Sequence, residues 1–197
     1  MNALTVLFLL AFVVSVDQRI IAPVLPSIAE SLRATPGGIG LAMTSYAFAY
    51  GTSQLGYGTL SDRYGRVRVV RLAAIGFCVS TALSALSTGT WQFVAVRLLA
   101  GACAASVIPL TLVYIGDTVE YARRQVVVGR FSVVTSAGLA FSAAIGGAVA
   151  HFASWRVMLA GYAVVALVPA VLLWRLPADP PSRAADEIGR ASCRERV

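Results

Sequence analysis

The sequence predicts an all-α membrane protein with six transmembrane helices. Hydrophobic residues make up 58% of the 197 residues, only 13% are charged, and the mean hydropathy is +0.77. A soluble domain usually has about a quarter of its residues charged. The apolar residues also lie in blocks of roughly 20 or more, the length that a helix needs to cross a hydrocarbon layer of ~30 Å. Because lipid offers the backbone no hydrogen-bond partner, each block is expected to be helical.

Six apolar blocks, separated by residues that favour turns, are the candidate spans. They comprise residues 4–28, 39–60, 69–86, 91–115, 126–150 and 156–176. Pro36-Gly37-Gly38 separates the first two blocks, the polar run 87–90 separates the third from the fourth, and residues 151–155 separate the last two. The first block lacks the basic start of a signal peptide and is too long for one, so we expect it to be retained.

The arginines predict how the spans are oriented. All sixteen basic residues are arginines. The stretches after the second, fourth and sixth spans hold Arg63, Arg66, Arg68, Arg71, Arg123, Arg124, Arg130, Arg175 and Arg183. The opposite side has only Arg33 and Arg156. By the positive-inside rule, the arginine-rich side and both ends of the chain face the cytoplasm at the inner membrane. Topology therefore explains the basic charge, and no nucleic-acid partner is expected.

The carboxy-terminal residues differ from the rest of the chain. Residues 1–176 are expected to form the six-helix bundle, and residues 177–187 are expected to begin a polar cytoplasmic linker. Residues 188–197 resemble the translation of a common sequencing adapter, so we expect them not to belong to the gene. The chain would then lack a carboxy-terminal six-helix half. The alternative is that these ten residues are an ordinary basic cytoplasmic segment.

The stretch between the second and third spans carries the most specific motif. It reads Gly58-Thr-Leu60-Ser-Asp62-Arg63-Tyr-Gly65-Arg66. This pattern resembles the signature of the major facilitator superfamily, transporters whose amino-terminal bundle consists of two inverted three-helix repeats. Topology alone explains the arginines but not the spaced glycines and aspartate. The resemblance implies a cytoplasmic gate, in which Gly58 allows close helix approach, Gly65 allows a tight turn, and Asp62, Arg63 and Arg66 make charged contacts that break and re-form.

The fourth and fifth spans extend the resemblance. Arg97 and Gly101 are similar to a second family motif, whose arginine is implicated in proton coupling. In the fifth span the glycine spacing resembles that of the family's antiporters, with Ser142-Ala143 in place of Gly-Pro; the glycines are Gly129, Gly138, Gly146 and Gly147. Gly101 and these four are expected to be helix-packing residues. The resemblance implies proton-coupled efflux of drug-like compounds or sugars.

Two charged residues are expected within the membrane, Asp17 in the first span and Arg97 in the fourth. A carboxylate at this depth costs roughly 3 kcal/mol, so it normally faces a partner or a cavity. Arg19 lies about 200° around the helix from Asp17, which makes Arg97 the expected partner. In the family fold both helices line the central cavity. We expect Asp17 to take and release a proton while Arg97 changes its proton affinity. The alternative is a fixed ion pair that only orients the helices.

Polar residues of the second span are candidates for the substrate cavity or for helix packing: Tyr46, Tyr50, Ser53 and Gln54. Cys78, Cys103 and Cys193 have neither metal-ligand nor disulfide spacing, and there is one histidine, so we expect no metal, no catalytic residue and no enzyme activity. The proton gradient takes the place of a cofactor. The expected partners are the lipid bilayer, protons, a small-molecule substrate and the missing half. The alternative function is a complete six-helix homodimeric carrier or channel.

Overall fold

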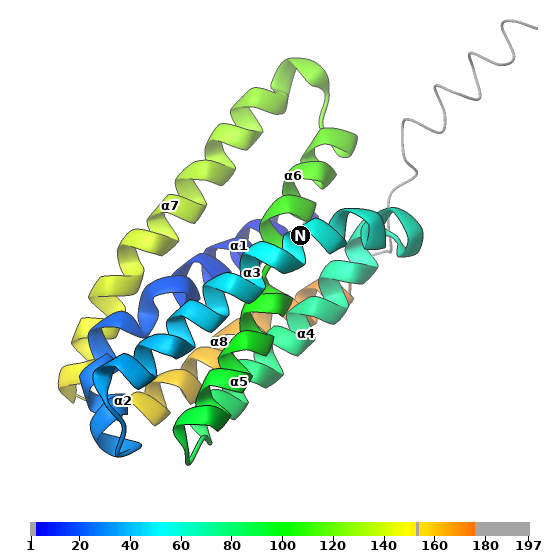
Figure 1. The fold of residues 1–197 in the computed structure, drawn as a ribbon. Helices are drawn as coiled ribbons and strands as arrows, with labels where there is room; N and C mark the ends of the chain where they lie inside the picture. The colour runs from blue at the N-terminus through cyan, green and yellow to red at the C-terminus, as the bar shows by residue number, and fades with distance from the viewer. Residues whose placement is uncertain (1–2, 153, 176–197) are drawn as a thin grey trace, which may run out of the picture.

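A computed structural model describes residues 3–152 and 154–175, and the regular elements of this part are all helices (Figure 1). In chain order they are α1 (Ala3–Ile20), η1 (Ala22–Val24), α2 (Leu25–Ser31), α3 (Pro36–Tyr64), α4 (Arg66–Ala85), α5 (Thr90–Ala104), α6 (Val107–Thr118), α7 (Tyr121–Phe152) and α8 (Trp155–Trp174). They form the six spans of the predicted bundle. The expected linker 177–187 and the adapter-like segment 188–197 lie outside the described residues.

The first and fourth spans are interrupted, whereas the apolar pattern predicts each as one continuous helix. The first breaks at η1, where Pro23 and Pro26 follow each other closely. The fourth breaks between α5 and α6, at Ala105 and Ser106. Proline has no N–H and its ring clashes with the carbonyl four residues earlier. For Pro109 that carbonyl belongs to Ala105, which accounts for the position of the second break.

Several expected helix ends were also wrong. Thr35 caps α3, since its hydroxyl oxygen accepts a hydrogen bond from the Gly38 N–H at 3.1 Å. Pro36-Gly37-Gly38 therefore form the first turn of this helix and do not separate the first two spans. Gly65 alone connects α3 to α4, so the arginines assigned to a loop there lie in helical turns. The arginines expected in the loop before the fifth span likewise lie within α7.

Among the described residues, five helical segments are long and apolar enough to cross a membrane. The helix α3 is not one of them. Its 29 residues are long enough to span, but hydroxyl and amide side chains such as Thr44, Thr52 and Gln54 lower its hydropathy. The span that is least like a lipid-embedded helix therefore carries both the candidate cavity residues and the gate motif.

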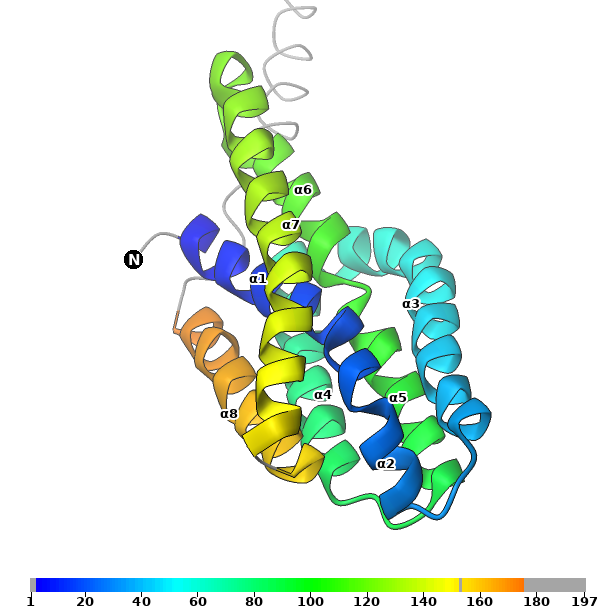
Figure 2. The same cartoon turned by 90° about the vertical axis from the view of Figure 1, so that its left-hand side faces the viewer.

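The helices pack in a pattern that follows the two three-helix repeats. The most extensive contacts join α3 to α5, α1 to α7, and α4 to α8 and α5. In this fold each of the first three spans has a counterpart among the last three. Replacing each span by its counterpart turns the contact of spans two and four (α3 and α5) into the contact of spans five and one (α7 and α1). The same replacement leaves the contact of spans three and six (α4 and α8) unchanged. In Figure 2, α3 and α8 lie at opposite sides of the bundle, and the turn between α6 and α7 extends beyond the other helices.

Candidate functional site

A buried ion pair joins the two interrupted spans. The guanidinium of Arg97 on α5 donates two hydrogen bonds to the carboxylate of Asp17 on α1, Nη1 to Oδ1 at 3.2 Å and Nη2 to Oδ2 at 2.9 Å. Asp17 is 0% exposed and Arg97 2%. This bidentate geometry is the strongest form of an arginine–carboxylate contact. The partner expected for Asp17 from the sequence is thus the one that the structure provides, while the proposed proton transfer stays a prediction.

Two tyrosines complete the surroundings of the pair. The centroid of the Tyr46 ring lies 4.6 Å from the Cζ atom of Arg97, a cation–π contact that adds to the ion pair. The hydroxyl of Tyr162 on α8 donates to the Val13 carbonyl, one helical turn before Asp17. Among the described residues, the Tyr46 hydroxyl and Arg97 Nε have no hydrogen-bond partner although both are buried. The site therefore contains two buried hydrogen-bond donors that the described residues leave unused.

The candidate cavity residues do not have equivalent positions. Tyr46 is buried against Arg97 and is 4% exposed, so it belongs to the ion-pair site. Tyr50 stacks on Tyr46 with 6.2 Å between ring centroids, and it is half-buried near the side chains of Gln18 and Gln54. Of this set, Tyr50 and Gln54 therefore extend a polar strip along α3 away from the pair.

The gate motif forms the end of the α3–α4 hairpin. Gly65 has a φ angle of 89° and a ψ angle of 140°, a conformation that is strained for any residue with a side chain. Arg66 pairs with Asp117 at the end of α6 and has Asp62 Oδ1 4.0 Å away. The motif pattern does not identify Asp117 as a gate residue. The feature of the sequence that could have indicated Asp117 is an acidic residue at the arginine-rich end of the fourth span.

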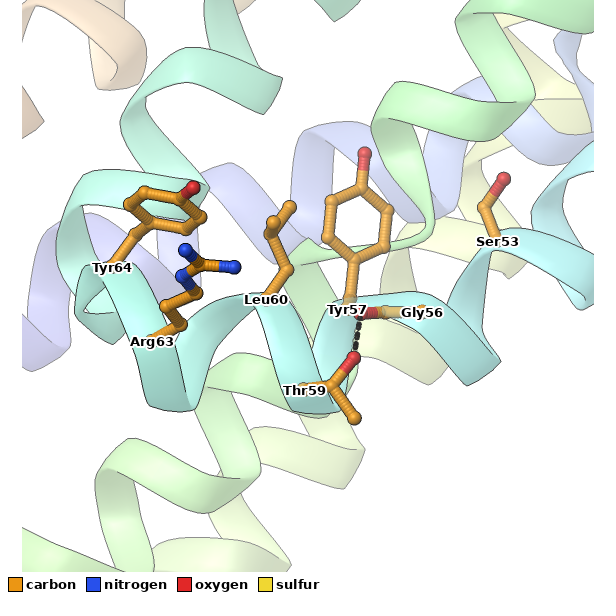
Figure 3. A pocket seen from close by; sticks show the side chains of 7 residues that line it. All are labelled: Ser53, Gly56, Tyr57, Thr59, Leu60, Arg63 and Tyr64. Carbon is orange, nitrogen blue, oxygen red and sulfur yellow. Dashed lines mark hydrogen bonds between the residues drawn. The ribbon is translucent and has the colours of Figure 1, made fainter.

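The other motif residues lie outside this ion pair. Arg63 is exposed and its Cζ lies 5.4 Å from the ring centroid of Tyr64. Beside it, along α3, is a hollow of about 600 Å³ whose lining includes Ser53, Tyr57 and Leu60 (Figure 3). A Cβ atom added at Gly58 would meet nothing within 4 Å, so in the described bundle this glycine does not make the close helix contact that was expected.

Three of the five candidate packing glycines lie at close helix crossings. A Cβ atom at Gly101 would come within 2.3 Å of the Tyr46 carbonyl oxygen, where α5 crosses α3. On α7, the same addition at Gly138 or Gly146 would meet backbone oxygens of α1 at 2.8 Å. Gly129 and Gly147 face open space in the described bundle, so they do not pack there as expected.

Comparisons with known proteins agree with this architecture. The sequence model of the Major Facilitator Superfamily matches residues 7–195. Multidrug efflux pump LfrA of Mycolicibacterium smegmatis is 28% identical over 172 residues, covering 87% of this chain and 34% of that protein. Puromycin resistance protein pur8 of Streptomyces alboniger is 27% identical over 177 residues, covering 89% and 35%. The chain thus spans about a third of the length of these curated relatives.

Solved structures share the fold at lower sequence identity. A bacterial homolog of the human lysosomal transporter Spinster, in an inward-facing conformation, superposes with a TM-score of 0.83 at 18% identity, covering 91% of this chain and 43% of the other. The proton:xylose symporter XylE gives a TM-score of 0.78 at 20% identity, covering 89% and 44%. In both cases the six helices of this chain match somewhat less than half of the other protein.

Proposed function

Because the chain belongs to the Major Facilitator Superfamily, we propose that its six helices form one bundle of a secondary transporter that moves small molecules by alternating access. The observation that carries this proposal is the buried Asp17–Arg97 pair between the two interrupted spans. Interrupted helices that meet near the membrane midplane are where transporters of this kind place coupling and substrate sites. The relatives named as a multidrug efflux pump and a puromycin resistance protein favour export of drug-like compounds.

Proton coupling follows from the chemistry of the pair. A proton that binds Asp17 removes its charge and leaves Arg97 buried without a counter-ion, which is costly in a low-dielectric setting. Arg97 must then move toward water or toward another acceptor, and its loss of contact with Asp17 releases α5 from α1. The deprotonated pair would hold the helices in one state and protonation would favour the other. The proton:xylose symporter that shares the fold supports this choice of coupling ion.

The gate would act at the arginine-rich end. Arg66 links the start of α4 to Asp117 on α6 and also faces Asp62, so it has two acidic neighbours between which to divide its contacts. Charged contacts at a partly exposed position are individually weak and can break and re-form during a transport cycle. In this proposal the second bundle competes for these charges when the arginine-rich side closes.

A second six-helix bundle is part of the proposal. The coverage of 34% to 44% of its relatives agrees with one bundle of a longer transporter. Sequencing the source DNA across the codons after Asp186 tests this. A reading frame that continues into six further apolar spans supports two bundles in one chain. A stop codon after Val197 would instead favour a six-helix protein that pairs with itself as a carrier or channel.

Proton-driven export of a fluorescent drug-like cation from energised membrane vesicles tests the role of Asp17. The gene recovered by that sequencing is compared with its Asp17→Asn variant and with the double variant Asp17→Asn/Arg97→Gln. We expect Asp17→Asn to lose at least nine-tenths of the proton-driven transport, roughly a tenfold loss. The double variant should stay uncoupled, because it removes the buried charge without restoring the proton site.

The double variant also separates the two roles considered for the pair. If the pair only orients α1 and α5, the neutral Asn–Gln pair replaces its hydrogen bonds and restores proton-driven transport. Restoration, or full transport by Asp17→Asn alone, would contradict proton transfer by Asp17. Equal amounts of each variant in the membrane, measured by immunoblot, exclude a trivial loss of protein.

A further inference from the structure

Two grooves of similar construction lie on the outside of the bundle. One, of about 500 Å³, opens between α3 and α4 and has Cys103 of α5 as its floor. The other, of about 380 Å³, opens between α7 and α8 and has α1 as its floor. We name them the arginine-end groove and the opposite groove. The two grooves correspond to each other in the two repeats. The first is lined by spans two, three and four, and the second is lined by their counterparts, spans five, six and one.

The inverted repeats place the grooves at opposite ends of the bundle. The arginine-end groove lies beside the α3–α4 turn, and its lining includes Tyr57, Leu60, Tyr64, Arg68 and Leu72. The opposite groove lies toward the start of α8, and its lining includes Val13, Ile20, Ile145, Val157 and Gly161. In a protein that spans a bilayer, each groove therefore faces a different leaflet.

Charge distinguishes the two grooves. The arginine-end groove is apolar except for Arg68 and the two tyrosine hydroxyls, and the described residues that line it include no acidic one. The opposite groove has no charged lining residue among those described. Arg68 is exposed and makes no hydrogen bond or ion pair within the described part of the chain. One groove therefore offers an available cation at its mouth and the other does not.

Neighbouring arginines at this end are engaged elsewhere. Arg66 pairs with Asp117 and Asp62. Arg71 donates from Nε to the Leu173 carbonyl at 3.0 Å and lies over the Trp174 ring. With the described residues Arg68 makes no such contact. It stands one helical turn before Leu72, which lines the apolar part of the groove and is 67% exposed.

We propose that the arginine-end groove binds a phospholipid with an anionic headgroup. One acyl chain lies between Leu60 and Leu72 and reaches toward Cys103, while the phosphate accepts hydrogen bonds from Arg68. The tyrosines Tyr57 and Tyr64 suit the interfacial depth where the headgroup meets the hydrocarbon. An arginine beside an anionic lipid surface is expected to favour such a lipid roughly fivefold. This inference depends on the bilayer location of the chain and not on proton-coupled transport.

The test uses competition between two lipids for the purified, delipidated 197-residue chain. The chain is incubated in detergent with equal amounts of dioleoyl phosphatidylglycerol and dioleoyl phosphatidylcholine, and the retained lipid is identified by native mass spectrometry. We expect the wild type to retain phosphatidylglycerol roughly fivefold over phosphatidylcholine. The Arg68→Gln variant should retain both equally. The Arg123→Gln variant, which loses an exposed arginine outside the groove, is the matched control and should keep the preference.

A second pair of variants tests the apolar part of the groove. Leu72→Trp places a larger side chain over the arginine-end groove at an exposed position, so it should abolish lipid retention without disturbing the core. Gly161→Leu partly fills the opposite groove, where an added Cβ meets nothing within 4 Å, and should leave retention of phosphatidylglycerol unchanged. Circular dichroism checks that each variant is folded. Equal effects of Arg68→Gln and Arg123→Gln, or undiminished retention in Leu72→Trp, would overturn the proposal. No transport is measured, so failure of this inference is distinct from failure of the proposed function.

Discussion

Gly65 is the single residue between α3 and α4, and its backbone conformation is one that side chains disfavour. Replacement by alanine is expected to lower the free energy of unfolding by about 1–3 kcal/mol, because a Cβ atom is strained at this φ angle. Unfolding in increasing dodecyl sulfate, followed by circular dichroism, measures the change. Gly58→Ala is the control: its added Cβ meets nothing within 4 Å, so it should be neutral or stabilising by up to about 1 kcal/mol. Equal losses in both variants would contradict the assignment of strain to Gly65.

A single residue can be placed from the sequence when its burial in an apolar span has a large free-energy cost. A carboxylate within an apolar block demands a partner, and this led from Asp17 to Arg97. Asp117 and Tyr162 were missed for different reasons. Asp117 stands at the end of an apolar block, where charges are ordinary, and its partner is distant in sequence. The Tyr162 hydroxyl bonds a backbone carbonyl, which leaves no pattern in the side chains.

At the scale of helices, close crossings depend on particular glycines. Gly101→Ala is expected to destabilise the bundle by about 1–3 kcal/mol, because its Cβ would overlap the α3 backbone at Tyr46 and force α3 and α5 apart. Gly129→Ala on α7 has open space and should be neutral or slightly stabilising. The same dodecyl sulfate titration distinguishes them. A Gly101→Ala variant as stable as the wild type would show that α3 and α5 separate at little cost.

The existence and order of the helices could be predicted, whereas their interruptions and ends could not. Apolar blocks of sufficient length demand helices in lipid, whatever their packing. The breaks depend on which carbonyl a proline meets, as Pro109 meets that of Ala105, and on whether neighbouring helices compensate. Pro169 lies inside α8 without ending it. Pro36-Gly37-Gly38 predict a break by their composition, but α3 begins at these residues because Thr35 caps the helix there.

For the whole molecule, the testable property is its orientation in the membrane. Thr88 and Glu120 are exposed and lie in turns at opposite ends of the bundle. In a background without native cysteines, a cysteine replacing Thr88 should react with a membrane-impermeant maleimide added to intact spheroplasts. A cysteine replacing Glu120 should react only after the membrane is opened, since the arginine-rich end is expected to be cytoplasmic. The reverse pattern would place the arginines outside.

The buried Asp17–Arg97 pair also has a consequence for how the protein is made. The two residues are 80 positions apart in the sequence, so α1 enters the bilayer before the ribosome has synthesised α5. At about 5–20 residues per second the carboxylate waits roughly 4–16 s for its partner. During this interval the first helix carries an uncompensated acid in hydrocarbon. Its integration is therefore expected to become stable only after α5 has entered the bilayer and Arg97 has paired with Asp17.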